Sequence, residues 1–325
     1  MPTTTSSTTP SRLSPRPLPP NITSVQPGGG VCYQIELTWG RLRRFCLRVF
    51  RPGYVQRMAA CRRGDAAGCP HEVLDPRDLK YCRNLCTAEW LEADDPFAWR
   101  ERIPFARWGL AELQLMGYPL LALSVALLFS PVWPLALVSG TVLGLVVYFF
   151  RDPPRQVPVE AGLLVAPADG KVVEITRLDH DDFVGGPAVR IGIFLSIFNV
   201  HVNRSPCQAR VISLDYKPGK FLSALKPASA LENESMWIGL EEDVAPHRRL
   251  AVRQIAGQFA RRIVCNLRPG EALGRGQKFG MIKLGSRTEL ILSDEPALRV
   301  EAHVGQVVKA GLTVLARCPS TGTVA

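Results

Sequence analysis

Three residues in the C-terminal half of the chain, Asp169, His201 and Ser286, have the side chains of an acid, a base and a nucleophile. A histidine titrates near working pH and suits a general base, and a carboxylate can orient it. Ser286 follows Gly285 directly, so its hydroxyl can approach a carbonyl that has no Cβ beside it, in an N-to-O acyl shift. The three residues predict a catalytic set defined by geometry and not by chain order.

Each of these residues also has an ordinary structural interpretation. Gly285 and Ser286 are typical of a tight turn, Asp169 with Gly170 is a turn signal, and His201 could be a packed, hydrogen-bonded histidine. Three cations near them are candidates for binding a substrate carboxylate or phosphate, with solvated surface charge as the alternative: Lys283, Arg204 and Arg287.

The segments around these residues predict a mainly β (α+β) domain. Short β-rich runs separated by Gly and Pro turns are typical of a sandwich or barrel-like fold. The final run, 304–316, resembles the hairpins of lipoyl carrier domains. The expected strands lie within 162–176, 189–198, 211–216, 251–255, 263–267 and 288–293.

Upstream of the β-rich part lie two apolar, uncharged runs, Tyr118 to Phe129 and Val132 to Phe150. A spanning helix needs about 20 apolar residues, and roughly 10 to 14 is more typical of an interfacial segment. The second run is therefore long enough to cross and the first is marginal. Together they predict a membrane-associated helical hairpin, and arginines on both flanks place its ends on the cytoplasmic side. A buried hairpin in a soluble protein is the alternative.

The first part of the chain carries no motif to which chemistry can be assigned. Residues up to about Gly30 are rich in Ser, Thr and Pro and predict disorder. The next segment, 31–101, alternates Arg-rich and Cys-containing pieces. Its six cysteines do not repeat as two close pairs, so no metal site is predicted, and three later cysteines are expected to be buried thiols of a reducing compartment.

The net charge of +10 favours an anionic partner, but composition does not choose between nucleic acid and an acidic membrane. The motifs do. From about Arg102 to Arg317 the chain resembles the short-form phosphatidylserine decarboxylase proenzymes. The resemblance rests on five pieces in the family's order: the hairpin ending in FFRDP at 149–153, APADGK at 166–171, FLSIFNVHVNR at 194–204, GQFARR at 257–262 and RGQKFGMIKLGSR at 275–287.

The resemblance implies a lipid enzyme that makes its own cofactor. Ser286 would attack Gly285, giving a β chain ending at Gly285 and an α chain whose first residue becomes a pyruvoyl group. That group would form a Schiff base with phosphatidylserine and accept electrons as carbon dioxide leaves, giving phosphatidylethanolamine. His201 would act as base in cleavage or as proton donor after decarboxylation, with Asp169 orienting it. Long-form relatives carry two histidines here, so whether His201 serves both steps stays open.

The expected domains are an extension of unknown role (1–101), the membrane hairpin (102–155) and the self-cleaved catalytic domain (156–325). The resemblance also implies location at the cell membrane, an anionic membrane surface as partner, and no nucleic acid. The oligomeric state, homo-oligomer included, stays open. Two rival functions remain: a pyruvoyl decarboxylase of another serine-headed lipid, and a non-catalytic, membrane-anchored lipoyl-like domain.

Overall fold

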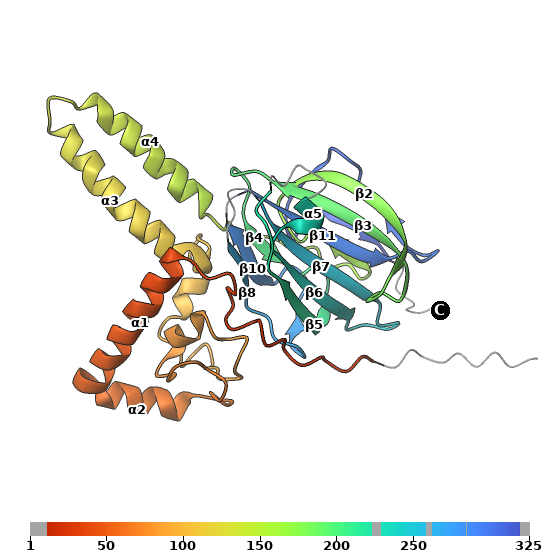
Figure 1. Ribbon diagram of the computed structural model, residues 1–325, viewed down its shortest axis with the longest axis horizontal. Coiled ribbons are helices and arrows are strands. Elements are labelled where there is room, and N and C mark those ends of the chain that lie inside the picture. The colour runs from red at the N-terminus through yellow and green to blue at the C-terminus, as the bar shows by residue number, and fades with distance from the viewer. Residues whose placement is uncertain (1–11, 223–228, 258–261, 284, 319–325) are drawn as a thin grey trace, which may run out of the picture.

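Runs of Val, Ile and Leu build the β domain, because such residues pack well on a pleated surface. The computed structural model describes residues 12–222, 229–257, 262–283 and 285–318. Its main sheet has eight antiparallel strands in the order β13-β2-β3-β11-β7-β6-β5-β9, and it curls around the core (Figure 1). β11 lies between β3 and β7 and is buried along nearly its whole length, which makes it an inner strand of this sheet.

Two three-stranded sheets complete the domain, in the orders β4-β10-β8 and β1-β14-β12. The mainly β class is confirmed, and each predicted strand is present within a few residues. The C-terminal segment differs from a simple hairpin, since β13 pairs with β2 and β14 pairs with β1 and β12. The strands are β1 Leu163–Val165, β2 Gly170–Asp181, β3 Gly186–Leu195, β4 Val202–Arg204, β5 Ala209–Lys217, β6 Ser235–Glu242, β7 Arg249–Ala256, β8 Arg262–Cys265, β9 Ala272–Leu273, β10 Lys278–Lys283, β11 Ser286–Ser293, β12 Arg299–Val300, β13 Val307–Val308 and β14 Val314–Arg317.

The helices lie on one side of the β domain, apart from the short α5 (Figure 1). Two of them form an antiparallel hairpin that projects away from the sheets, and a hydrogen bond of 2.9 Å between Ser124 and Ser139 joins them. The α-helices are α1 Val31–Phe50, α2 Pro52–Cys61, α3 Leu110–Leu128, α4 Pro134–Phe149 and α5 Ser229–Glu232, and the 3-10 helices are η1 Pro76–Lys80, η2 Ala98–Glu101 and η3 Arg107–Gly109.

The predicted hairpin is present, but the relative lengths of its helices were predicted wrongly. The first helix starts at Leu110, upstream of the apolar run, and with η3 it is long and apolar enough to cross a membrane. The second helix starts only at Pro134, whose fixed φ suits the first position of a helix, and it has 16 residues. Most of the large apolar side chains on both helices are exposed, which contradicts a buried soluble hairpin.

The prediction of disorder is wrong for residues 12–30. This segment runs along the β domain, where Ile22 and Val25 are buried and Cys265 donates its amide hydrogen to the carbonyl of Val25 at 2.8 Å. The segment has no apolar periodicity because it is held by backbone hydrogen bonds and a few side chains. Residues 1–11 lie outside the described part of the chain.

The cysteines divide as the sequence indicates. Cys207, Cys265 and Cys318 are buried free thiols, as predicted. In the N-terminal part, Cys69 and Cys86 form a disulfide, and the sulfur of Cys82 lies close to both. The N-terminal cysteines therefore contribute to a small core of their own.

Candidate active site

The bond between Gly285 and Ser286 lies where the chain passes from one sheet to another. β10 belongs to the sheet with β4 and β8, whereas Ser286 begins β11 of the large sheet, opposite Leu195 and Ala256. Gly285 has φ +60°, and a Cβ built on it would meet nothing within 4 Å. This backbone conformation strongly favours glycine, so the glycine permits a sharp turn and leaves one side of the peptide bond open.

The hydroxyl of Ser286 is buried and makes no hydrogen bond within the described part of the structure. A buried polar atom without a partner costs roughly 1 to 3 kcal/mol, and a catalytic role is one of the reasons for which proteins keep such a group. The hydroxyl is therefore free to act on the neighbouring carbonyl.

The loop from β3 to β4 brings His201 toward this turn. The loop begins at Leu195, the β-sheet partner of Ser286, and the carbonyl of His201 accepts the amide hydrogen of Ile282 at 3.1 Å. Inside the loop, the side-chain oxygen of Asn199 accepts hydrogen bonds from the amide and hydroxyl of Ser196, both at 2.8 Å. The loop is therefore held next to this turn at both of its ends, by Leu195 opposite Ser286 and by His201 opposite Ile282.

The contacts of His201 determine which ring nitrogen carries the proton. Nδ1 lies 2.8 Å from the carbonyl oxygen of Asn199, which can only accept, so Nδ1 donates. Nε2 is buried and has no hydrogen-bond partner among the residues that the structure describes, and the ring packs on Phe149 with centroids 4.5 Å apart. Burial, reinforced by the nearby charge of Arg151, lowers the pKa of His201 to about 4. His201 is thus neutral at physiological pH, and its Nε2 is available to accept a proton.

Asp169 lies in the turn before β2, and its partners are other groups than His201. Its carboxylate accepts from Nη2 of Arg155 at 2.9 Å and from the amide of Ala310 at 2.8 Å. The neighbouring carbonyl of Pro167 accepts the amide hydrogen of Arg204 at 3.0 Å. The turn is therefore fastened to β4, close in sequence to His201, while Nδ1 of His201 is oriented by a backbone carbonyl.

All three predicted substrate-binding cations are buried, so their interpretation as solvated surface charge is wrong. Arg287 pairs with Glu174 and with Glu289. Its guanidinium lies across the backbone of Gly192, where a side chain would collide with it. Burial raises the pKa of Glu174, but hydrogen bonds from Arg287, Thr176 and Arg190, together with the charge of Arg287, lower it to about 2.

The other two cations lie in different surroundings. Arg204 pairs with the buried Asp152 at 2.8 Å and donates to the carbonyl of Gly276. Lys283, at the end of β10, pairs with Glu112 of the hairpin helix α3 and lies 3.5 Å from the side-chain oxygen of Gln26. Lys283 therefore links the cleavage-site strand to the hairpin.

An apolar cavity of about 590 Å³ opens between the hairpin and the β domain. Its walls come from the start of α1, the facing sides of α3 and α4, and the loop before His201. Among its lining residues are Phe149, Phe198, Val146 and Met116, and the cations Lys283 and Arg262. The cavity lies beside the ring of His201 and within a few residues of Ser286, which is not itself in its wall.

Sequence reasoning missed two groups in this neighbourhood. Glu234 is buried, its carbonyl accepts from the amide of Ala256 at 2.9 Å, and burial raises its pKa to about 7. The polar run around Asn233 and Glu234 just before β6 was the available signal. The second group is Arg155, which in the sequence is one of the arginines that flank the apolar hairpin. Most of the GQFARR piece, 258–261, lies outside the described residues.

Comparison with known proteins gives a consistent result. The profile of the family "Phosphatidylserine decarboxylase" matches residues 142–316, a range that contains every predicted site residue. A phosphatidylserine decarboxylase proenzyme of Rhodopirellula baltica is 52% identical over 239 residues, which cover 74% of this chain and 98% of the relative. The chain belongs to the phosphatidylserine decarboxylase family. Proenzymes of Symbiobacterium thermophilum and Nitrosomonas eutropha are 43% and 41% identical, over 62% of this chain in each case and over 94% and 92% of the relatives.

The site fits what a proenzyme of this family needs. A proenzyme that makes a pyruvoyl group requires a serine with an unengaged hydroxyl behind an unhindered carbonyl. Ser286 and Gly285 provide both. The resemblance predicted from the motifs is therefore confirmed at the level of the family.

Proposed function

We propose that the chain is a precursor that cuts itself between Gly285 and Ser286 and then converts phosphatidylserine to phosphatidylethanolamine at a membrane surface. The observation that supports this most directly is the position of Ser286. Its unpaired, buried hydroxyl follows a glycine of positive φ at the crossover between two sheets, in a chain of this family.

The proton transfers are assigned to His201. Its neutral ring has a free Nε2 lone pair, so it accepts the hydroxyl proton of Ser286 as the oxygen attacks the carbonyl carbon of Gly285. The resulting ester breaks by β-elimination, which frees the carboxylate of Gly285 and leaves a dehydroalanine at position 286. Water then hydrolyses the dehydroalanine to a pyruvoyl group, and its nitrogen leaves as ammonia. Asp169 serves as a positioning residue, because through Arg155 and Ala310 it fixes the turn that holds β4 and hence His201.

The pyruvoyl group left at position 286 supplies a ketone that condenses with the substrate amine and takes up electrons as carbon dioxide leaves. The protein holds that position between Leu195 and Ala256 on neighbouring strands. The apolar cavity receives an acyl chain, and Lys283, which lines the cavity and is paired with Glu112, also meets the lipid phosphate. Arg204 and Arg287 stay in their internal ion pairs and keep the surrounding strands in place.

The hairpin α3 and α4 brings this site to its substrate. We propose that its exposed apolar side chains dip into the bilayer, which places the cavity at the level of the lipid head groups. The family match contradicts the non-catalytic carrier alternative. A decarboxylase of another serine-headed lipid would use the same residues and is separated from this proposal by assay.

The first experiment is a denaturing gel with intact-mass analysis of the purified protein. We expect two chains, the smaller running from position 286 to Ala325 and blocked by a pyruvoyl group. Ser286→Ala should remain a single chain, while the control Ser293→Ala, at the other end of the same strand, should be cut normally. An uncut wild-type chain in a folded preparation would refute self-processing.

The second experiment measures carbon dioxide release from vesicles that contain phosphatidylserine. Lysophosphatidylserine and free serine test whether the acyl chains and the lipid phosphate are required. Faster turnover of a different serine-headed lipid would replace the proposed substrate but leave the cleavage chemistry intact.

A further inference from the structure

A second cavity lies at the base of the hairpin, away from the active site. It has a volume of about 350 Å³ and is formed by α1, η1, η2 and the start of α3. We call it the cationic pocket, because its lining includes six Arg and Lys side chains: Arg43, Arg44, Arg77, Lys80, Arg100 and Arg107. All its lining residues precede residue 142, so the pocket lies outside the range that matches the family profile.

Only two carboxylates, Glu36 and Asp78, line the pocket. Arg43 and Arg44 share Asp78, and Lys80 pairs with Glu36. Arg77 pairs with Asp75 and Arg107 with Glu101, but these two acids lie outside the pocket lining. The cations therefore outnumber all these acids. An excess of positive charge in a hollow is a site for an anion.

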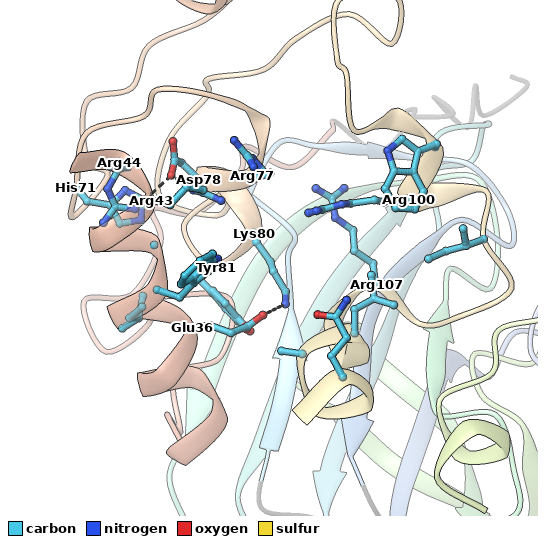
Figure 2. Close-up of a pocket in the computed structure, with 18 residues that line it drawn as sticks. Glu36, Arg43, Arg44, His71, Arg77, Asp78, Lys80, Tyr81, Arg100 and Arg107 are labelled. Carbon is cyan, nitrogen blue, oxygen red and sulfur yellow. Dashed lines mark hydrogen bonds and ion pairs between the residues drawn. The ribbon is translucent and has the colours of Figure 1, made fainter. Parts of the chain in front are cut away.

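Arg100 is the clearest case of a charge left over. Within the described part of the chain it has no carboxylate partner, and its guanidinium lies against the rings of Phe97 and Trp99. Figure 2 shows Arg100 and Arg107 reaching into the cavity from the side opposite Arg77. Burial and then the charges of Arg77 and Arg107 lower the pKa of Arg100, as expected where cations gather without enough acids.

The surroundings of the pocket indicate which anion it meets. Ala111 and Gln114 in its wall belong to the first turns of α3, and the next residues along that helix, Leu115 and Met116, are exposed and apolar. The pocket therefore lies where the hairpin leaves water for hydrocarbon, which is the depth of lipid phosphates. Exposed Trp39 and Trp99 at its edge are typical of that interface.

Helix α1 supports the same placement. It runs from the base of the hairpin in a different direction from α3 (Figure 1). Large apolar side chains recur on one face at helical spacing and are exposed: Val31, Ile35, Trp39, Leu42, Phe45 and Val49. An amphipathic helix of this kind, with arginines beside its apolar face, is suited to lie in an anionic membrane surface.

We propose that the cationic pocket binds the phosphate of an anionic phospholipid head group, as a site separate from the one where decarboxylation occurs. Two or more guanidinium groups hold the phosphate oxygens, while the apolar face of α1 lies among the acyl chains. The proposal rests on the membrane placement of the hairpin in the proposed function. It adds a preference for anionic lipid that is independent of the substrate.

The test measures binding of the full chain to vesicles of phosphatidylcholine with and without phosphatidylglycerol, an anionic lipid that carries no serine. Arg100→Gln is the variant of choice, since its loss leaves no carboxylate unpaired. Arg102→Gln is the matched control: it removes the same charge from the same segment, but Arg102 is exposed, pairs with Glu92 and does not line the pocket. We expect Arg100→Gln to weaken binding to anionic vesicles about fivefold. Arg102→Gln should have little effect, and binding to neutral vesicles should not change.

Equal weakening by both variants would show attraction by general charge and overturn the proposal, as would an unaffected Arg100→Gln. Arg100→Lys keeps the positive charge and should recover part of the affinity for anionic vesicles. If Arg100→Gln weakened binding by misfolding the N-terminal part of the chain, restoring the charge would not recover the affinity. Stabilisation by inorganic phosphate or glycerol phosphate without any response to anionic vesicles would assign the pocket to a soluble anion and overturn the lipid proposal. Self-cleavage should be normal in all these variants, so a chain that binds lipid but stays uncut would contradict the proposed function alone.

Discussion

The β domain and the N-terminal unit, residues 31–109, differ in how completely their cationic side chains are paired with carboxylates. In the β domain, Arg155, Arg204 and Arg287 are each matched by a buried or half-buried carboxylate. In the cationic pocket the charges exceed the acids, and Arg100 has none among the described residues. In the β domain, the buried atoms without a hydrogen-bond partner among the described residues include two uncharged groups at the proposed reaction site, Nε2 of His201 and the hydroxyl of Ser286. In both regions we place a reaction or a ligand at groups of this kind, whereas the ion-paired groups hold the fold.

The largest effect is expected at the unmatched histidine. His201→Ala should slow self-cleavage by about 10² to 10⁴-fold, the usual contribution of a general base. Time courses of cleavage, followed on gels from freshly translated precursor, measure this. In the wild type, the rate should persist as pH falls through 6.5 and decline only near the His201 pKa of about 4, because the neutral ring is the base. A decline centred at 6.5 would contradict the buried, neutral state.

The next largest effect is expected at the buried ion pair between Asp152 and Arg204. Asp152→Asn leaves Arg204 buried without its anion, and should destabilise the protein by about 3 to 5 kcal/mol. Urea denaturation of the uncleavable Ser286→Ala chain measures it without the complication of two chains. A change within experimental error would remove the distinction between the two regions.

Glu234 gives a smaller, pH-dependent effect. Its folded-state pKa is about 7, above the ordinary value of 4.5, so the folded protein holds a proton that the unfolded chain has lost. Stability should therefore fall as pH rises from about 4.5 to 7, by at most about 3 kcal/mol. Glu234→Gln should flatten this part of the stability profile. An unchanged slope in that variant would assign the dependence to other groups.

The smallest effect on stability is expected at Arg100, the cation of the pocket that has no carboxylate partner among the described residues. Arg100→Gln should change the free energy of unfolding by less than about 1 kcal/mol, since among the described residues it loses only its contacts with the rings of Phe97 and Trp99 and no ion pair. The same urea titration measures it. A cost similar to that of Asp152→Asn would show that Arg100 supports the fold, and it would weaken the case for a ligand.

The sequence predicts the parts of the site that are local in the chain. Gly285 and Ser286 are adjacent, and His201 and Asn199 lie in one loop, so their motifs carry the geometry. The partner of Asp169 was not predictable, because Arg155 and the amide of Ala310 reach it through tertiary packing of distant segments. The burial of Lys283 and Arg287 was missed for the same reason, since their carboxylate partners come from other elements or need the strand register to be known.

In the N-terminal unit, the sequence alone predicted almost nothing about the pocket. Arginine-rich pieces with no periodic repeat predict no chemistry, and only the packing of α1, η1 and α3 gathers them around one cavity. The helical spacing of the apolar residues in α1 was not recognised in the sequence, and whether such a face is buried or exposed depends on what covers it. The segment 12–30 gave no signal because backbone groups, which every sequence has, make many of its contacts.

The inner position of β11 determines whether a cleaved molecule stays assembled and whether it can refold. Strands β3 and β7, which belong to the larger chain, flank β11 on both sides. The two products of a cut at Gly285 would therefore stay together in one folded domain. Unfolding would then release a short second chain. Refolding would need two molecules to meet, so its yield would depend on concentration. The precursor can renature alone, but the mature enzyme would rely on slow unfolding to persist.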